Sequence, residues 1–334
     1  MNSFVKNTLK FLLFLGIGAG LVYLIVRKIT RDDWEHIKAA AGNANYFWVG
    51  LSLLIGAFSH LLRSLRWRLL IESIDKKPGL ANTFCSVMIG YMANYALPRL
   101  GEVSRCGVLS KYEKISFAGL AGTVIVERII DLLMMFVFFL VMLLLSFNKV
   151  YSIVKTKATT VLEGKWDSLK HINPIVFIAI ALIVIGGSWF LYTKKDHLFG
   201  FARKFIANFL EGIRSIGKLK NPLLFWVYSV LIWVMYLLML YVCFFCFSET
   251  SNLTLSDALV VLIFATFGVI APVPGGIGAY QWLVISVLTH IYFISQNISF
   301  TLAWIIWGSQ LILVVFLGLI SLILLPILNK NEQT

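Results

Sequence analysis

Three charged residues lie in an otherwise apolar stretch, directly after a proline that interrupts it. In chain order the stretch contains Asn94, Tyr95, Pro98, Arg99, Gly101, Glu102 and Arg105. The planar guanidinium of arginine donates paired hydrogen bonds that match a phosphate, so Arg99 and Arg105 could clamp one phosphate-containing group. Because Glu102 and Arg105 are three residues apart, an ion pair along one helix is the alternative interpretation. The stretch is therefore a candidate anion-binding site.

A second charged group, Glu127, Arg128 and Asp131, lies within a long apolar run. Charged side chains at membrane depth are costly and usually face a partner or a water-filled cavity. Glu127 and Asp131 are four residues apart and share a helix face, from which Arg128 is turned by about 100°. The two carboxylates would either neutralise arginines or bind a coupling cation or proton. The arginines available for the first role are Arg63, Arg66, Arg99 and Arg105.

A third candidate site carries no charge. It comprises Pro272, Pro274, Gly275, Gly276 and Gly278. These residues precede a helix predicted over 279–294 and leave backbone N–H groups free at its beginning. Because the N-terminus of a helix presents free amides and a partial positive charge, it attracts anions. Gln281 would lie in the first turn of that helix, where its amide could donate or accept a hydrogen bond.

The sequence contains no recognisable catalytic or metal-binding motif. Neither a nucleophile elbow nor a zinc-protease motif is present, and no Lys-Ser/Thr pair follows the glycines as it does in a P-loop. Cys243 and Cys246 have the spacing of a redox or metal pair, but they lie among apolar residues without a second pair. That setting favours a role as small core residues. We therefore expect no catalysis, no metal and no other cofactor.

The composition places these candidate residues on membrane helices. Of the 334 residues, 59% are hydrophobic and 13% are charged, and the mean hydropathy is +0.87. These values are typical of an all-α polytopic membrane protein, here predicted to form a single domain over 1–334. Six runs are long enough to span a bilayer. They cover about 9–28, 46–66, 117–147, 172–193, 222–247 and 300–326.

Two further apolar segments, about 80–112 and 256–294, are each interrupted by proline and glycine. In the second segment, the arm before the break has 15 residues, which span roughly 23 Å against a hydrocarbon core of about 30 Å. We therefore expect two re-entrant helical hairpins in addition to the six spans. One belongs to the first half of the chain, about 1–147, and the other to the second half, about 172–326.

The distribution of lysine and arginine predicts that both termini are cytoplasmic. In that orientation the inner segments hold 19 basic residues and the outer segments hold 9. The two hairpins then enter from opposite faces, as in the inverted repeats of transporters. The alternative is that both breaks are peripheral kinks. Residues 199–219 are predicted to form an amphipathic helix on the cytoplasmic surface, with a solvated connector as the alternative. With no soluble fold to bind nucleic acid, the net charge of +13 indicates anionic lipid as the partner.

The candidate residues also resemble the pattern of a known family. The matching positions are Asn94, Pro98, Arg99, Gly101, Glu102 and Arg105, then Glu127, Arg128 and Asp131, then Pro272, Pro274, Gly275, Gly276 and Gly278. In this order and spacing they are similar to the lysylphosphatidylglycerol synthase transmembrane-domain family, also called flippase-like. That family includes the membrane part of the bacterial multiple peptide resistance factor. The resemblance implies a lipid-handling membrane domain with re-entrant helices.

Two features depart from the family pattern. No soluble aminoacyltransferase domain follows residue 326, so we do not expect this chain alone to synthesise a lysyl-lipid. Gln281 stands where the family is expected to have an acidic residue, so roles that need a carboxylate at that position are not expected either.

Together these features predict a protein of the bacterial cytoplasmic membrane that moves a lipid with an anionic or phosphate-containing head group between leaflets. Substrate contacts are expected at both breaks and at Gln281, with Glu127, Arg128 and Asp131 balancing charge or coupling transport to an ion. The expected partners are anionic phospholipids or polyprenyl-phosphate-linked lipids, a second copy of the chain, or a lipid-synthesis enzyme. The alternatives are a non-transporting accessory subunit of an envelope-lipid enzyme and a lipid transferase with its site in the membrane.

Overall fold

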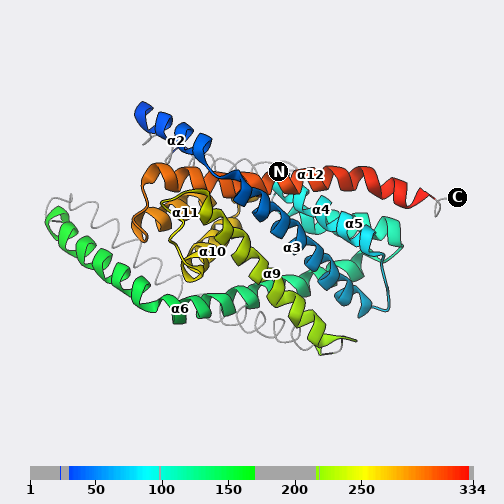
Figure 1. Ribbon diagram of the computed structural model, residues 1–334. Coiled ribbons are helices and arrows are strands. Elements are labelled where there is room, and N and C mark those ends of the chain that lie inside the picture. Colours follow the sequence, from blue (N-terminus) through cyan, green and yellow to red (C-terminus); the bar gives the residue numbers. More distant parts are fainter. Residues whose placement is uncertain (1–22, 24–29, 98, 170–215, 218, 331–334) are drawn as a thin grey trace, which may run out of the picture. The chain divides into compact units, whose positions relative to one another are not determined.

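The computed structural model describes residues 23, 30–97, 99–169, 216, 217 and 219–330, with the side chains of 147–169 excepted. All regular elements in this part of the chain are helices, which agrees with the all-α prediction (Figure 1). They are α2 (Arg31–Asn43), α3 (Tyr46–Glu72), α4 (Leu80–Ala96), α5 (Leu100–Glu113), α6 (Phe117–Leu169), α9 (Pro222–Cys243), η1 (Phe244–Cys246), α10 (Leu255–Ile270), η2 (Pro274–Gly276), α11 (Ala279–His290) and α12 (Gln296–Leu328). The chain separates into two compact units, Met1–Leu145 with Ile216–Thr334, and Ser146–Ser215. Every contact described below lies within the first unit.

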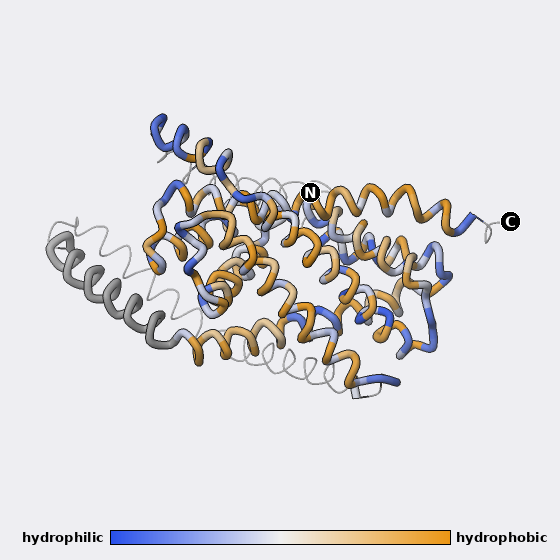
Figure 2. The backbone as a smooth tube through the Cα atoms, in the orientation of Figure 1, coloured by the Kyte–Doolittle hydropathy of each residue, from blue (hydrophilic) through white to orange (hydrophobic). Residues whose placement is uncertain are grey.

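Four of the described helices are long and apolar enough to cross a bilayer. They are Tyr46–Glu72, Phe117–Ser146, Pro222–Cys246 and Gln296–Leu328. These helices coincide with four of the six predicted spans, and their apolar character is visible in Figure 2. The spans predicted at 9–28 and 172–193 and the surface helix predicted at 199–219 lie almost wholly outside the described residues. The protein is thus a multi-pass membrane protein.

The first interrupted segment forms a helical hairpin from α4 and α5. These helices have 17 and 14 residues, or about 25 and 21 Å, so each is shorter than a bilayer core of about 30 Å. The two helices lie against each other at Gly90 and Gly101, where a Cβ on Gly101 would collide with the Gly90 carbonyl oxygen. Beside this contact, Oδ1 of Asn94 accepts a hydrogen bond of 2.7 Å from the Gly101 amide. The two glycines and Asn94 therefore hold the end of α4 against the beginning of α5 at the break.

The open end of this hairpin is also tied together. Glu113, the last residue of α5, accepts hydrogen bonds from the Gly79 amide at 2.9 Å and from the Asn82 side chain at 2.7 Å. The connections before and after the hairpin each contain a residue in the left-handed region, Asp75 at φ 57° and Lys114 at φ 53°. Residues other than glycine adopt that region rarely. Sharp turns thus bound the hairpin on both sides.

The second interrupted segment forms a similar hairpin from α10 and α11, which have 16 and 12 residues. Gly268 of α10 lies against the backbone of Tyr280 in α11, so these helices also meet at a glycine. The break between them contains three glycines with positive φ, a conformation that glycine adopts without a steric cost. They are Gly275 (56°), Gly276 (70°) and Gly278 (80°). The glycine run is therefore required by the path of the backbone.

Helix α12 packs against both hairpins, α4 of the first and α11 of the second. Near its beginning it follows α11 after a short connection, so the second hairpin opens at that end. In its last third, Gly318 lies against Met92 of α4. Just beyond its end, Asn329 exchanges two side-chain hydrogen bonds of 2.9 Å with Asn82, at the open end of the first hairpin. The two hairpins therefore open toward opposite ends of α12.

The two breaks meet between these ends. The ring of Tyr95, next to the first break, lies against Gly275 of the second break. Trp307 of α12 donates a hydrogen bond of 2.8 Å from its indole nitrogen to the Gly275 carbonyl, and its ring meets that of Tyr95 edge-on at 6.2 Å. Two segments about 180 residues apart in the sequence are thus joined at their proline-glycine breaks.

Candidate functional site

Helix α3 carries two arginines on a buried face. Arg63, Arg66 and Trp67 are three and four residues apart, so their side chains share one side of the helix. All three are buried, whereas Leu54 and Phe58 are 70% and 50% exposed. The helix is therefore polar toward the protein interior and apolar outward, as expected of a membrane helix with ionisable residues.

Helix α9 lies antiparallel to α3 and supplies polar partners to these arginines. The Asn45 amide, before α3, donates to the carbonyl of Cys246, after α9, at 3.0 Å. Further along, Arg63 donates to the Tyr236 hydroxyl at 2.7 Å, and Arg66 donates to the Ser229 hydroxyl at 3.4 Å. The antiparallel pair thus fixes both guanidinium groups.

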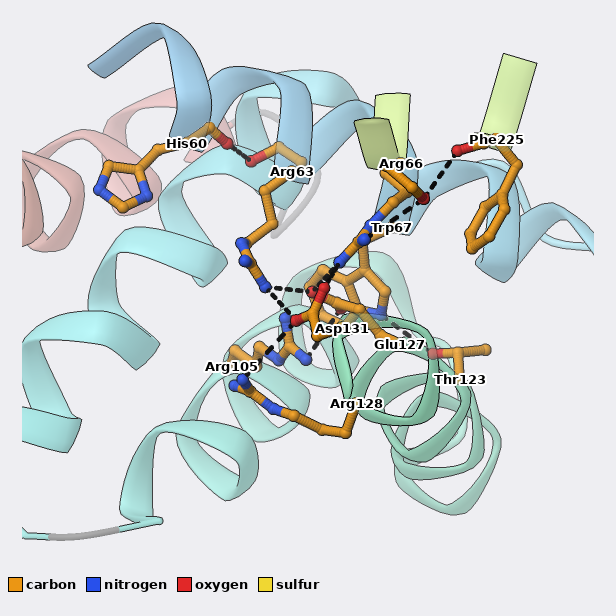
Figure 3. A network of polar contacts seen from close by, with 12 residues as sticks. His60, Arg63, Arg66, Trp67, Arg105, Thr123, Glu127, Arg128, Asp131 and Phe225 are labelled. Carbon is orange, nitrogen blue, oxygen red and sulfur yellow. Dashed lines mark hydrogen bonds and ion pairs between the residues drawn. The ribbon is translucent and has the colours of Figure 1, made fainter. Parts of the chain in front are cut away.

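The two carboxylates of α6 bridge the arginines of α3 (Figure 3). Arg63 lies 3.0 Å from Glu127 Oε1 and 2.8 Å from Asp131 Oδ2. Arg66 lies 3.2 Å from Glu127 Oε1 and 2.6 Å from Asp131 Oδ1. Each carboxylate therefore contacts both arginines, which is the first of the two roles predicted for Glu127 and Asp131. Their predicted placement on one helix face is what makes this possible.

Arg105 of α5 reaches the same carboxylate from the opposite side. Its Nη2 atom lies 2.9 Å from Glu127 Oε2, an ion pair too bent to be a hydrogen bond. The guanidinium also lies over the ring of Trp67, 4.7 Å from its centroid. Trp67 is oriented by a hydrogen bond of 3.0 Å from its indole nitrogen to the Thr123 hydroxyl. Arg105 is buried, and its Nε atom has no hydrogen-bond partner among the described residues.

Glu102 and Arg128 form a second ion pair between α5 and α6, at 3.1 Å. This pair is half-exposed, with 29% and 42% of the two side chains accessible. Arg128 also lies 3.9 Å from Asp131, although helix geometry predicts that it points away from that face. The alternative predicted from the sequence, an ion pair of Glu102 with Arg105 along α5, is not formed in the described part of the chain. Each of the two residues pairs with α6 instead.

We call these seven residues the arginine network. They are Arg63, Arg66, Glu102, Arg105, Glu127, Arg128 and Asp131. Four arginines face three carboxylates, so the network carries one positive charge in excess within the described residues. An uncompensated charge away from bulk water is costly, and an anion would relieve that cost.

A small polar cavity adjoins the network at the first break. Its volume is about 10 Å³, room for about one water molecule. It is lined by Val87, Gly90, Tyr91, Asn94, Gly101, Arg105 and Arg128. Four of the residues predicted as site residues from the sequence therefore share one cavity.

The remaining residues of the first break lie apart from the network. Arg99 is exposed, adopts the left-handed region at φ 66°, and forms no ion pair among the described residues. Pro98 lies outside the described residues. In this conformation Arg99 and Arg105 therefore do not form the predicted clamp, because Arg105 is engaged with Glu127.

Some of the backbone hydrogen-bonding groups of the second break already have partners within the protein. Gln281, fully buried, accepts a hydrogen bond of 2.7 Å from the Gly278 amide, so it caps the beginning of α11. Its side-chain nitrogen has no partner in the described part of the chain. Pro274 and Gly276 are buried, and the Gly275 carbonyl accepts from Trp307. The Gly276 amide donates to the Val273 carbonyl at 3.0 Å, so two of the glycine amides predicted to attract an anion are already bonded internally.

Several contacts of the site were not predicted from the sequence. Tyr91 and Tyr236 flank Arg63, whose guanidinium lies 5.5 and 5.9 Å from their ring centroids. Tyr95 and Trp307 line the junction of the breaks. Each is an aromatic residue in an aromatic-rich membrane chain. Tyr95 directly precedes the first break, which is a sequence signal, whereas Tyr91, Tyr236 and Trp307 have no such signal in the sequence.

Comparison with known proteins identifies the chain's family. The lysylphosphatidylglycerol synthase TM region matches residues 9–318. A UPF0104 membrane protein of Methanocaldococcus jannaschii is 30% identical over 130 residues, which cover 38% of this chain and 36% of that relative. The chain thus matches about a third of the relative's length. No solved structure matches. Because the family match includes the arginine network and both breaks, the chain belongs to the lysylphosphatidylglycerol synthase TM region family.

Proposed function

We propose that the protein translocates a lipid with an anionic or phosphate-containing head group across the membrane. The observation that carries this proposal is the arginine network, in which four arginines face three carboxylates next to the first break. Guanidinium groups bind phosphate through paired donors, and a buried excess of positive charge favours an anionic ligand. The proposal assigns no catalysis to the chain.

The arrangement of the two hairpins supports a path for the head group. Helix arms shorter than the bilayer, joined at proline-glycine breaks, are typical of transporter binding sites at the repeat interface. Because the hairpins open toward opposite ends of α12, we propose that they are re-entrant from opposite faces and that their breaks meet inside the membrane. Irregular backbone is tolerated there when protein or a water-filled cavity surrounds it.

Arg105 is the residue we assign to head-group binding. Its contact with Glu127 is a bent ion pair, and its Nε atom is without a partner among the described residues. A phosphate would compete with Glu127 for the Nη2 and Nε donors of Arg105. Because the adjoining cavity has room for only about one water molecule, it would have to widen to admit that phosphate. Arg99, exposed at the tip, would meet the head group first, and the second break would present the buried amide nitrogen of Gln281.

In the remaining network residues, the carboxylates would neutralise the arginines that do not bind the head group. Glu127 and Asp131 contact Arg63 and Arg66, which favours charge balance as their role. We propose a bacterial cytoplasmic membrane as the location and a cytoplasmic side for both termini, because the basic residues gather on that side. The first hairpin would then open toward the cytoplasm.

Native mass spectrometry of the purified full-length protein with its retained lipids tests the proposal. The Arg99→Ala/Arg105→Ala double variant is compared with Arg31→Ala/Lys38→Ala, which removes two exposed basic residues of α2. We expect the α2 variant to retain as much anionic lipid per protein as wild type, and the Arg99→Ala/Arg105→Ala variant to retain less. Equal and unselective retention by all three would overturn the phosphate site and favour an accessory role.

A transport assay separates translocation from binding. In proteoliposomes with a fluorescent anionic phospholipid, reduction by external dithionite reports how fast inner-leaflet lipid reaches the outer leaflet. We expect wild type to raise that rate above protein-free vesicles and the Arg99→Ala/Arg105→Ala variant not to. If wild type and empty vesicles behaved alike for phospholipid and for polyprenyl-phosphate lipid, the transport function would be wrong. Co-purification of a stoichiometric enzyme would then support the accessory subunit.

A further inference from the structure

An apolar groove lies between α4, α5 and α12, on a part of the surface that the arginine network does not use. Its volume is about 330 Å³, at the lower end of the range for ligand pockets, which is roughly 300–1,000 Å³. The apolar lining consists of Ile89, Gly107, Val108, Tyr112, Leu322 and Leu325. One charged residue, Lys111, completes the lining. The groove shares no lining residue with the polar cavity at the first break.

The charged end of the groove lies at the open end of the first hairpin. Lys111 is in the last turn of α5, two residues before Glu113, which binds Gly79 and Asn82. Asn82 in turn bonds to Asn329. These polar side chains lie at the beginning of α4, at the end of α5 and just after α12. Polar residues gathered where several membrane helices begin or end indicate a membrane-water boundary. The groove therefore runs from that boundary toward the apolar interior.

The surroundings of Lys111 favour an anion. Its ammonium group lies 5.5 Å from the ring centroid of Tyr112 and is exposed, so it is free to turn toward a ligand at the groove mouth. Further basic residues belong to the connections at the same end. They are Lys76, Lys77 and Lys114. Basic residues near the membrane surface attract anionic lipid head groups.

We propose that this groove holds one acyl chain of an anionic glycerophospholipid, with the phosphate at Lys111. At about 330 Å³ the groove has room for part of a single acyl chain. The second chain lies in the surrounding bilayer. This lipid is a resident ligand, distinct from the lipid proposed as transported.

Gly107 keeps the groove open. A Cβ built on Gly107 would meet no atom within 4 Å among the described residues, so a larger side chain enters free space without disturbing the helix. Substitution by leucine is therefore expected to occupy the groove and leave the fold intact. Gly50 of α3 offers a matched control, because it is also exposed and its Cβ would also meet nothing within 4 Å.

The test measures lipid binding by native mass spectrometry. Delipidated full-length protein is titrated with an equimolar mixture of phosphatidylglycerol and phosphatidylcholine that have the same acyl chains. We expect wild type and Gly50→Leu to bind one phosphatidylglycerol that Gly107→Leu binds at least about tenfold more weakly, because the chain has lost its place. We expect Lys111→Gln to lose the preference for phosphatidylglycerol, whereas Lys77→Gln keeps it. Equal binding of phosphatidylglycerol by Gly107→Leu and Gly50→Leu would refute the proposal that the groove holds an acyl chain. An unchanged preference of Lys111→Gln for phosphatidylglycerol would refute the contact between Lys111 and the phosphate.

The Arg99→Ala/Arg105→Ala variant distinguishes this inference from the proposed function. It is expected to keep the groove lipid while losing the lipid at the arginine network. Loss of the lipid from that variant, with full retention by Gly107→Leu, would place all lipid binding at the network and contradict the groove. Retention of the groove lipid by a protein that transports nothing would leave the groove standing and refute the transport function alone.

Discussion

The guanidinium of Arg105 lies 2.9 Å from Glu127, although the two residues come from different helices, α5 and α6. Glu127 at the same time contacts Arg63 and Arg66 of α3. One fully buried carboxylate thus joins the first hairpin to two helices that are long and apolar enough to cross the membrane. A head group that draws Arg105 away also removes one of the contacts between the hairpin and the rest of the site.

Arg105→Lys is expected to lower transport and lipid retention while leaving the fold intact. Lysine keeps the charge but lacks the planar fork that binds phosphate through two donors. The dithionite assay and native mass spectrometry measure the two effects, and we expect about a tenfold loss in each. Arg31→Lys, an exposed position in α2, should behave as wild type. Undiminished transport by Arg105→Lys would contradict the two-donor phosphate contact.

Arg66→Met is expected to destabilise the protein strongly. The guanidinium is fully buried and contacts both Glu127 and Asp131, and breaking a buried ion pair costs about 3–5 kcal/mol. Unfolding in detergent, followed by circular dichroism, measures the loss. Adding Asp131→Asn should recover part of it, because a neutral amide at position 131 needs the lost guanidinium, which Asp131 contacts at 2.6 Å, less than the carboxylate does. A loss no larger than that of Arg31→Met would show that the network does not stabilise the fold.

Gly101→Ala is expected to open the break of the first hairpin. The added methyl group would collide with the Gly90 carbonyl, and overpacking of this kind costs about 1–3 kcal/mol. Gly122→Ala in α6 is the control, because its Cβ would meet nothing within 4 Å and alanine favours a helix. Thermal unfolding should therefore shift downward for the first variant and not for the second. Equal stability of both would argue against the close approach of α4 and α5.

Tyr95→Cys and Trp307→Cys are expected to cross-link in the membrane with a short bismaleimide. The two rings lie 6.2 Å apart at the junction of the breaks. The background is a variant whose natural cysteines are replaced, namely Cys85, Cys106, Cys243 and Cys246. Tyr95→Cys paired with Asn329→Cys serves as the negative control, since Asn329 lies at the open end of the hairpin. Cross-linking of the control alone would refute the meeting of the breaks.

Much of the fold could be predicted from the sequence because its signals are local. Proline and glycine interrupt apolar runs, and Pro98 and Pro274 therefore mark the two hairpins directly. Four predicted spans coincide with long apolar helices. The spacing of Glu127 and Asp131 likewise gives their shared face without any knowledge of the partner helices.

The pairing within the site could not be predicted because it depends on contacts between distant segments. Glu102 and Arg105 are neighbours on one helix, yet each finds a partner on α6 instead. Their spacing along α5 does not indicate that each residue pairs with a residue of α6 in preference to its neighbour on α5. The contact of Tyr95 with Gly275 has the same origin, since it depends on the packing of α4 against η2 and of both breaks against α12.

The close approach of Gly90 and Gly101 has a mechanical consequence. Because the two arms of the first hairpin touch through their backbones and are tied again at Glu113, they cannot slide past each other without breaking both contacts. The two arms of the hairpin therefore move together as one rigid body. Once its contacts with α6, α12 and the second break are released, a rotation of the hairpin is absorbed at the left-handed turns of Asp75 and Lys114. Arg99 and Tyr95 lie at the opposite end of the hairpin, so a small change of dihedral angle at these turns becomes a large displacement at the break.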